Sequence, residues 1–269
     1  MKPPVALTVA GTDSGGGAGI AADLHTFAAH GVWGTCAVTA VTVQNTVLVG
    51  EVDILGAPLV TAQIGAVATD IGVIATKTGM LGVAVVVNAV AEAVREWDLH
   101  PLVVDPVALS STGRALLSPN GVDALRDVLV PLADLVTPNL AEAALLARAP
   151  EPPTDRDGMR RMADAILGLG AKAVLVTGGH LPGPEAADLL LRADGSEPCW
   201  FSGPHLDTGN THGTGCVLSA AVTARLARGE DLVQAVEGAK EFVTAAIAAG
   251  VELGAGPGAV NPSSGSSRP

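Results

Sequence analysis

Aromatic residues and cysteines are scarce in this sequence, and each scarcity limits what the fold can depend on. Aromatics make up 2% of the 269 residues, tyrosine is absent, and the 48% of hydrophobic residues are mainly Ala, Val and Leu. The three cysteines, Cys36, Cys199 and Cys216, are an odd number without C-x-x-C spacing, which predicts neither a disulfide framework nor a zinc site. A globule of this length buries roughly three quarters of its unfolded surface, so it needs no cross-links. We therefore expect a reduced, cytoplasmic protein, and MKPPVALTVAGTD resembles a strand and a turn rather than a signal peptide.

Basic residues and long apolar stretches are also few. Fifteen Lys and Arg stand against 27 Asp and Glu, which gives a net charge of −12 and disfavours nucleic acid as a partner. The uncharged stretch 78–91 has 14 residues, whereas a membrane span needs about 20, so no membrane partner is expected. Backbone amides can bind phosphate without side-chain charge. With only four lysines in the chain, we expect any phosphate chemistry to depend on such amides and on a metal ion.

Short apolar runs alternate along the chain with longer segments of helical period. The runs predict strands at residues 5–10, 36–43, 73–76, 102–104, 135–136 and 173–176. The longer segments predict helices at residues 20–30, 58–70, 83–97, 121–130, 157–169, 216–227 and 232–249. Strands that are apolar throughout and alternate with helices are typical of an α/β fold, a parallel sheet covered on both faces. Right-handed crossovers then bring the carboxyl ends of the strands, and any ligand site, to one edge.

The later part of the chain adds a hairpin and a change of composition. The runs 186–192 and 199–201, separated by the turn sequence ADGSEP, predict an antiparallel hairpin at the edge of the sheet. From Gly254 the chain is rich in Gly, Pro and Ser, which predicts a flexible tail over residues 254–269. No other linker interrupts the sequence, so we expect a single domain over residues 1–253.

Two glycine-containing loops precede predicted helices. In NTHGTGC, residues 210–216, the small residues let a ligand approach the first amides of the next helix, where a transferring phosphoryl group would fit. The alternative is a flexible helix start without a ligand. In AGTDSGGGAG, residues 10–19, the pattern is neither a Walker A loop nor a dinucleotide fingerprint, but a flat ligand could lie against it. The alternative is a turn whose Asp and Ser cap the helix.

Two acidic motifs follow predicted strands. In TPNLAE, Asn139 and Glu142 are three residues apart and would share one face of a helix, where they could hold a hydrated Mg²⁺. The alternative is a capping box made by the same two side chains. In VVDPV, Asp105 lies at the carboxyl end of a buried strand, on the expected ligand edge. Its alternative role is to cap the next turn.

Three further turns are weaker candidates. The loop 108–116 contains Arg114, which could fold over a phosphate or belong to an ordinary exposed loop. In KTGML, Met80 could contact a ligand or fill the core. In VTGGH, the glycines could admit a nucleotide, while His180 could simply bond the loop.

Seven motifs, in order within residues 5–251, resemble those of a known family: AGTDSGGGAGIAAD, AVTAVTVQNT, KTGML, VVDPV, TPNLAEA, GGH and NTHGTGC. They are similar to the motifs of the hydroxymethylpyrimidine/phosphomethylpyrimidine kinases of thiamine biosynthesis, in the ribokinase-like superfamily. The resemblance implies a three-layer α/β/α sandwich with a mostly parallel central sheet, ATP and Mg²⁺ as cofactors, and a homodimer. It implies transfer of the γ-phosphoryl group of ATP to the hydroxymethyl group of 4-amino-5-hydroxymethyl-2-methylpyrimidine. In this family, phosphorylation of the monophosphate to the diphosphate commonly follows.

The resemblance also assigns roles to single residues. Gln44 matches the pyrimidine-binding position, where a carboxamide can both donate and accept hydrogen bonds. Cys216 stands where many sugar kinases carry a catalytic aspartate, and at a helix N-terminus the pKa of its thiol is expected to fall. Thr177 replaces the lysine of many relatives, which should weaken ATP binding. The implied sets are: for substrate, Gln44, Gly11, Ala18, Asp23, Met80 and Val107; for ATP or phosphate, Asn139, Glu142, Lys77, Thr177, Gly179 and Thr211; for Mg²⁺, Asp105 and Glu142; for catalysis, Gly213, Thr214, Gly215 and Cys216.

Two other functions fit the same motifs. A pyridoxal or pyridoxine kinase shares the fold, and its flat substrate also carries a hydroxymethyl group, although Gln44 and Met80 favour the pyrimidine. A non-catalytic protein that binds pyrimidine or pyridoxal phosphate is disfavoured by Asn139, Glu142 and the loop 213–215.

Overall fold

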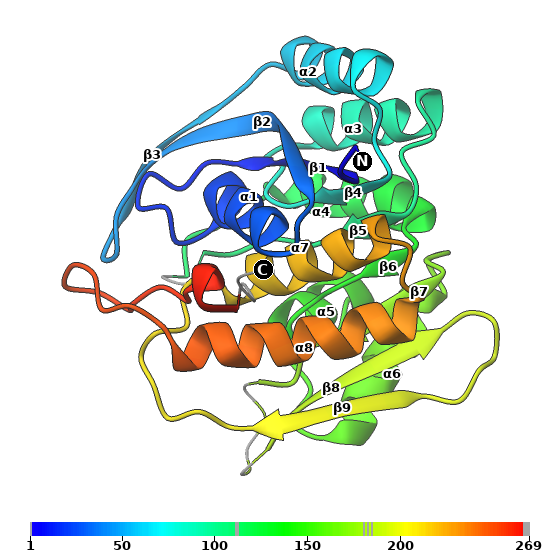
Figure 1. Ribbon diagram of the computed structural model, residues 1–269. Helices are drawn as coiled ribbons and strands as arrows, with labels where there is room; N and C mark the ends of the chain where they lie inside the picture. Colours follow the sequence, from blue (N-terminus) through cyan, green and yellow to red (C-terminus); the bar gives the residue numbers. More distant parts are fainter. Residues whose placement is uncertain (1, 111–112, 180, 182, 184, 266–269) are drawn as a thin grey trace.

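A nine-stranded mixed sheet runs through the part of the chain that the computed structural model describes, residues 2–110, 113–179, 181, 183 and 185–265 (Figure 1). The strand order is β3-β2-β1-β4-β5-β6-β7-β8-β9. All neighbours from β2 to β7 are parallel, and the pairs β2–β3, β7–β8 and β8–β9 are antiparallel. The strands are β1 Val5–Gly11, β2 Trp33–Gln44, β3 Val49–Ile54, β4 Ala75–Thr78, β5 Leu102–Val104, β6 Leu135–Val136, β7 Ala173–Val176, β8 Glu185–Arg192 and β9 Cys199–Pro204.

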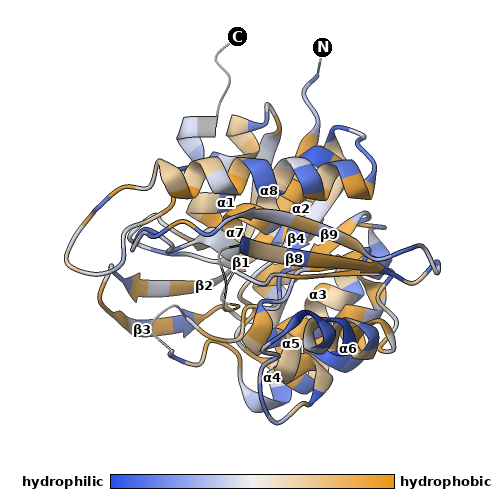
Figure 2. Cartoon of the chain, turned by 90° about the horizontal axis from the view of Figure 1, so that it is seen from below, coloured by the Kyte–Doolittle hydropathy of each residue, from blue (hydrophilic) through white to orange (hydrophobic). Residues whose placement is uncertain are grey.

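Helices cover both faces of this sheet. One apolar core joins the sheet to α2–α6, and two others join it to α1, α7 and α8. Figure 2 shows α8 on one side of the strands and α3, α5 and α6 on the other. This arrangement confirms the predicted three-layer α/β/α sandwich. The helices are α1 Gly19–Ala29, α2 Ala57–Asp70, α3 Ala84–Glu96, α4 Pro119–Ala124, α5 Leu140–Ala147, α6 Arg156–Leu167, α7 Thr214–Ala227 and α8 Leu232–Ala248.

The central strands are apolar because both of their faces are covered. Every residue of β1 is buried, and the same holds for β4, β5, β6 and β7. This is the pattern that a doubly covered parallel sheet requires. The few polar residues on these strands, among them Thr8 and Lys77, are also buried and therefore need partners inside the protein.

The sequence analysis missed the hairpin formed by β2 and β3. Ala40 pairs with Gly11 at the end of β1 and with Ile54 of β3, so residues 41–53 continue past the carboxyl edge of the sheet. Figure 1 shows this hairpin extending beyond β1. Its turn is organised by Asn45, whose Oδ1 accepts hydrogen bonds from the amides of Val47 and Leu48. The strand β3 alternates polar and apolar residues, unlike the buried runs from which the parallel strands were predicted.

The described part of the predicted tail, residues 254–265, contacts the rest of the fold, and residues 266–269 lie outside the described residues. Ala259 forms backbone bridges with Val251 and His212, and Val260 is buried. The amide of Gly256 donates to Thr46 Oγ1, 3.2 Å away, in the turn of the β2–β3 hairpin. Gly and Pro here shape turns whose backbone groups find partners in the fold. None of the described helices has the length and hydropathy that a membrane crossing requires.

Candidate active site

The predicted motifs meet at the carboxyl edge of the parallel strands. AGTDSGGG follows β1, VVDPV includes and follows β5, and TPNLAE follows β6. KTGML begins inside β4, because this strand lies at Ala75–Thr78, two residues later than predicted. NTHGTGC leads into α7, which packs against α1 and β4. His180 of the GGH motif and residues 111–112 of the loop 108–116 lie outside the described residues.

The two glycine loops touch each other. Gly213 has a φ of +86°, and a Cβ at this position would collide with the carbonyl oxygen of Gly17. Such a conformation and such a close approach both require glycine. The loop after β1 is organised by Asp13, whose Oδ1 accepts from the amide of Gly15 at 2.8 Å and whose Oδ2 accepts from that of Ala18 at 3.0 Å. The turn that was the alternative to a ligand site therefore exists, and it places the loop against the start of α7.

The first amides of α7 are arranged for an anion by helix geometry. The first i→i−4 bond of this helix runs from Val217 N to Gly213 O, at 2.9 Å. The amides that precede it lie at the positive end of the helix dipole and have no intrahelical acceptor. Gly215 is exposed and Thr214 is half-buried, so this end of the helix is open to a ligand. Thr211, also exposed, accepts from the hydroxyl of Thr214 through its carbonyl oxygen.

A buried ammonium group lies behind this helix start. Lys77 Nζ is 2.7 Å from Asp23 Oδ1 and 3.8 Å from Asp105 Oδ2, and all three side chains are buried. It also donates to the carbonyl oxygen of Cys216 at 3.5 Å. Burial alone would lower the pKa of Lys77, but the charge of Asp23 and its neighbours outweighs burial and raises it. Lys77 therefore stays charged and ties α1, β4, β5 and α7 together.

This pairing corrects two predictions. Asp23 was expected to line the substrate site, and Lys77 to contact phosphate. In the structure both side chains have no exposed surface, and Asp23 accepts hydrogen bonds from Lys77 and from Thr8 Oγ1, the latter at 2.6 Å. Each charge neutralises the other inside the protein, because an unpaired buried charge would be too costly.

The predicted thiolate at Cys216 is also corrected. Burial and the charges of Asp105 and Asp23 together raise the pKa of this thiol to about 12, against the lowering effect of Lys77. The residue as a whole is half-buried. Sequence reasoning considered the helix N-terminus but had no means of placing two carboxylates near the sulfur. At neutral pH, Cys216 is therefore a thiol that can donate a hydrogen bond.

Asn139 and Glu142 form the capping box that was the alternative to a metal site. Glu142 N donates to Asn139 Oδ1, and Asn139 N donates to Glu142 Oε2, each at 3.0 Å. Burial, together with the charge of Asp105, raises the pKa of Glu142 to about 8. Two buried carboxyl groups that repel each other fit a cation between them. The described residues contain no cluster of three or more metal-ligating side chains, but Mg²⁺ commonly uses one or two carboxylates, with water and phosphate completing its shell.

The loop after β7 is held by partners that sequence reasoning missed. Thr177 N donates to Pro138 O at 2.9 Å, which joins this loop to the one after β6. Gly178 N donates to Asp188 Oδ1 at 2.9 Å, and Lys240 Nζ is 2.7 Å from Asp188 Oδ2. A lone Asp in the apolar strand β8 was the available signal for this pair. Thr177 is half-buried and Gly179 exposed, as a nucleotide-binding loop requires.

The predicted substrate residues are divided between the sheet edge and the hairpin. A Cβ at Gly11 would lie 3.2 Å from Met80 Sδ, so these two positions are adjacent, and Met80 is 8% exposed. Ala18, directly before α1, and Val107, after β5, are half-buried. Gln44 ends β2, where it pairs with Val49 in the projecting hairpin.

The hairpin is fastened to the loops beside it. Thr42 N donates to Thr12 Oγ1 at 3.1 Å, and Thr42 Oγ1 donates to Thr12 O at 2.9 Å. On the other side, the guanidinium of Arg114 donates to the carbonyl oxygens of Val49 and Gly50. Arg114 thus binds the hairpin backbone instead of lying over a phosphate.

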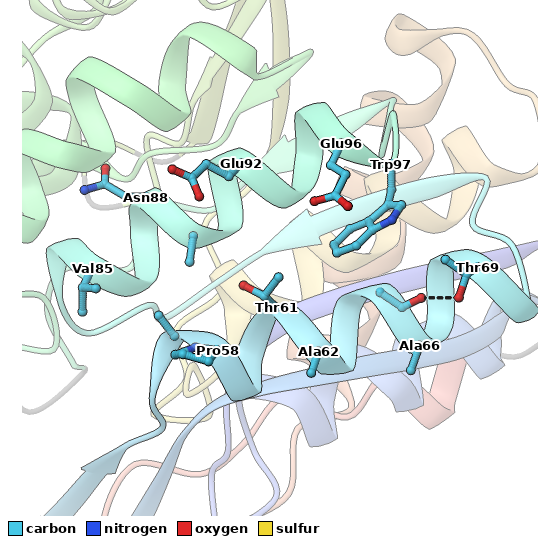
Figure 3. A pocket seen from close by; sticks show the side chains of 13 residues that line it. Pro58, Thr61, Ala62, Ala66, Thr69, Val85, Asn88, Glu92, Glu96 and Trp97 are labelled. Carbon is cyan, nitrogen blue, oxygen red and sulfur yellow. Dashed lines mark hydrogen bonds between the residues drawn. The ribbon is translucent and has the colours of Figure 1, made fainter.

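A groove in the described structure lies elsewhere. It has a volume of about 880 Å³ and runs between α2 and α3 (Figure 3). Figure 3 shows Thr61 and Ala62 of α2 on one wall and Val85, Asn88 and Glu92 of α3 on the other. None of the predicted site residues lines it. This groove is therefore a surface feature separate from the glycine loops.

Comparison with known proteins agrees with this geometry. Residues 13–261 match the family model described as phosphomethylpyrimidine kinase. The chain is 48% identical to a hydroxymethylpyrimidine/phosphomethylpyrimidine kinase of Rhizobium meliloti over 96% of each chain, and 41% identical to that of Escherichia coli over 97% of this chain and 98% of the other. Among solved structures, pyridoxal kinase of Bacillus subtilis in an ADP complex superposes with a TM-score of 0.90 at 38% identity and 98% coverage of both chains. A phosphomethylpyrimidine kinase of Clostridium difficile superposes with a TM-score of 0.79 at 39% identity, covering 91% of this chain and 100% of the other. The chain belongs to the phosphomethylpyrimidine kinase family.

Proposed function

We propose that this protein transfers the γ-phosphoryl group of ATP to 4-amino-5-hydroxymethyl-2-methylpyrimidine and then phosphorylates the monophosphate to the diphosphate, in thiamine biosynthesis. The observation that carries the proposal is the contact between the two glycine loops, where Gly213 approaches the backbone of Gly17. A phosphate at the start of α7 would then lie beside an alcohol held along the loop after β1. Relatives up to 48% identical carry names that state this activity.

The start of α7 would stabilise the phosphoryl group in transfer. Its first amides and its dipole favour spread negative charge, and phosphoryl transfer depends mainly on positioning and charge stabilisation. Asp105 and Glu142 would hold a hydrated Mg²⁺, because their oxygen atoms are close enough for their charges to interact. The bound ion would neutralise charge on the phosphates. Gln44 would bind the pyrimidine ring and Met80 would contact it, while Thr177, Gly179 and Thr211 would line the path of the nucleotide.

Cys216 would relay the proton of the substrate hydroxyl. Because its thiol is protonated at neutral pH, the sulfur would accept this proton while its own proton passes to an oxygen atom of the transferring phosphoryl group. A weak relay suffices where the transition state is loose and little proton transfer is needed early.

Product analysis is the decisive experiment. The protein is incubated with ATP, Mg²⁺ and the pyrimidine alcohol, and chromatography separates the mono- and diphosphates. Both products are expected in sequence. A protein that binds the pyrimidine but forms no product would contradict the kinase and support the non-catalytic alternative.

A pyridoxal kinase is the second candidate function. The observation in its favour is the high structural similarity to pyridoxal kinases, including that of Staphylococcus aureus in complex with AMP-PCP and pyridoxal, with a TM-score of 0.90. We expect kcat/KM to be larger for the pyrimidine, because Gln44 can form hydrogen bonds with a ring nitrogen and with the amino group of the pyrimidine at the same time. A kcat/KM that is larger for pyridoxal would reverse the order of the two functions.

We infer that the protein is a cytoplasmic homodimer. The supporting surface lies on α2, which carries no charge before Asp70 and exposes 54% of Leu59, and on α3, which exposes 61% of Val85. Large apolar side chains exposed on uncharged helix surface indicate a covered face. We expect light scattering to give the mass of two chains, and Leu59→Glu to give one. Leu253→Glu, at an equally exposed position outside this surface, is the control.

A further inference from the structure

A histidine–aspartate pair joins the two glycine loops. His212 Nε2 lies 2.9 Å from Asp13 Oδ2, and the two residues are 199 positions apart in the chain. The side chains are 15% and 3% exposed. Asp13 is a carboxylate that only accepts, so Nε2 is the donor. Burial would raise the pKa of Asp13, but the bonds from His212 and from the amides of Gly15 and Ala18 outweigh it and lower the pKa.

Each member of the pair holds one loop in place. Asp13 binds the amides of Gly15 and Ala18, and so fixes the turn that ends where α1 begins. His212 is fixed through its backbone, since its amide donates to Gly258 O and its carbonyl accepts from Val260 N, each at 3.1 Å. His212 directly precedes Gly213, whose left-handed conformation starts α7. The side-chain bond thus links a fixed point on one loop to a fixed point on the other.

The imidazole ring also packs on the backbone between the loops. A Cβ at Gly17 would lie 2.7 Å from Cδ2 of His212, so Gly17 is small where the ring lies against it. The start of α7 and the loop after β1 approach each other over this ring. The distance between these two segments therefore depends on the position of the His212 ring.

We propose that His212 and Asp13 are positioning residues that set the separation between the phosphate site at the start of α7 and the alcohol site along the loop after β1. This inference rests on the proposed function. Effective transfer needs the reacting atoms in near-contact geometry, and a displacement of about 1 Å can cost about 100-fold in rate. The pair acts through the loops and does not touch the reacting atoms.

A second pair of the same residue types provides a matched control. At the opposite edge of the sheet, His100 Nδ1 is 2.7 Å from Asp134 Oδ2, and Asp134 also accepts from the amide of Leu102. Both aspartates bind a histidine ring and backbone amides, but His100 precedes β5 at its amino end, away from the glycine loops. Removing this pair therefore measures the effect of losing a histidine–aspartate hydrogen bond that has only a structural role.

The experiment compares three substitutions of His212 with one of His100. In His212→Gln the side-chain amide nitrogen can take the place of Nε2, whereas in His212→Asn it falls short, and in His212→Ala it is missing. We expect His212→Ala and His212→Asn to lower kcat by about 100-fold with KM for ATP changed by less than about threefold. His212→Gln should recover at least about tenfold of this loss, and His100→Ala should keep kcat within about twofold of wild type.

Hydrogen exchange gives a readout that needs no substrate. We expect the amides of residues 13–19 to exchange about tenfold faster in His212→Ala, and no such change in His100→Ala. If kcat of His212→Ala stays within twofold of wild type, or if the exchange of residues 13–19 does not change, the proposal is overturned. If wild type fails to phosphorylate the pyrimidine while exchange in His212→Ala rises as expected, the proposed function fails and the loop coupling stands.

Discussion

The two edges of the central sheet use similar charged residues for different purposes. At the amino edge, Asp134 lies among His100, Lys172 and the amide of Leu102, with the ion pairs each 2.7 Å long. Two side chains and one backbone amide thus bind this single carboxylate. At the carboxyl edge, the ammonium of Lys77 pairs with the carboxyl groups of Asp23 and Asp105, while burial and the charge of Asp105 raise the pKa of Glu142 to about 8.

This difference in charge balance distinguishes a structural cluster from a functional one. If only the stability of the fold mattered, each buried charge would have an opposite charge or a hydrogen-bond donor beside it, as at the amino edge. An excess of buried carboxyl groups, together with loops that expose amides, indicates a place prepared for a cation and an anion that arrive together. The His212–Asp13 and His100–Asp134 pairs show that residue type alone does not reveal the purpose.

Replacement of Lys77 is expected to have the largest effect. Lys77→Met leaves the buried Asp23 and Asp105 without their counter-charge, and the free energy of unfolding should fall by about 3–5 kcal/mol in urea titrations. Lys172→Met, which removes a 70% exposed partner of Asp134, should cost at most about 1 kcal/mol. Combining Lys77→Met with Asp23→Asn should recover part of the loss. Equal costs at Lys77 and Lys172 would remove the distinction between the two edges.

Cys216 tests whether the carboxyl edge contributes chemistry as well as binding. Cys216→Ala should lower kcat by about 100-fold, because it removes the proton relay but leaves the helix amides in place. Cys216→Asp should match or exceed wild type, since a carboxylate can accept the proton directly. Cys199→Ser, at the partly exposed cysteine of β9, serves as the control and should leave kcat unchanged. Unchanged turnover in Cys216→Ala would refute the relay.

The sequence predicted the fold and the grouping of motifs well, for a physical reason. Apolar runs such as 102–104 and 173–176 coincide with β5 and β7 because burial on both faces leaves no choice of residue type. The hairpin strand β3 was missed because it alternates, and the turn-rich composition after residue 254 does not reveal bridges such as that of Ala259 to His212.

For the site, the sequence indicated which residues belong to it but not what each residue does. The family resemblance assigned Asp23, Lys77 and Cys216 to one site, but their roles depend on which charges face inward. The pairing of Lys77 with Asp23 and the raised pKa of Cys216 both follow from contacts between elements far apart in the sequence. The same holds for Asp188 and Lys240, which come from β8 and α8. No spacing rule along the chain encodes such contacts.

Glu142→Gln separates the capping function of this residue from its charge. Glutamine at the third helical position can still serve a capping box, and the substitution removes the repulsion with Asp105. We therefore expect the melting temperature to stay the same or rise, while the Mg²⁺ concentration for half-maximal activity increases by about tenfold. Asp155→Asn, at the N-cap of α6, is the control and should leave the Mg²⁺ dependence unchanged. A Mg²⁺ dependence that is unaltered in Glu142→Gln would exclude this carboxylate as a metal ligand.

Acid unfolding is expected to show the smallest effect. It compares the contributions of one carboxylate at each edge of the sheet to the stability of the fold. Burial would raise the pKa of Asp134, but the bonds from Lys172, His100 and the amide of Leu102 lower it, and the bonds to Asp13 lower its pKa in the same way. A carboxyl group with a lowered pKa stabilises the folded state above its unfolded value, and this contribution is lost as the pH falls through the folded pKa. Asp13→Asn and Asp134→Asn should therefore each be less stable than wild type at pH 6, and the difference should shrink as the pH falls below 4. Unfolding monitored by circular dichroism from pH 6 to pH 2.5 measures both, and kinase assays at pH 7 should then show lost activity for Asp13→Asn alone. A difference in stability that grows toward low pH would show that these carboxylates are not held ionised by their partners.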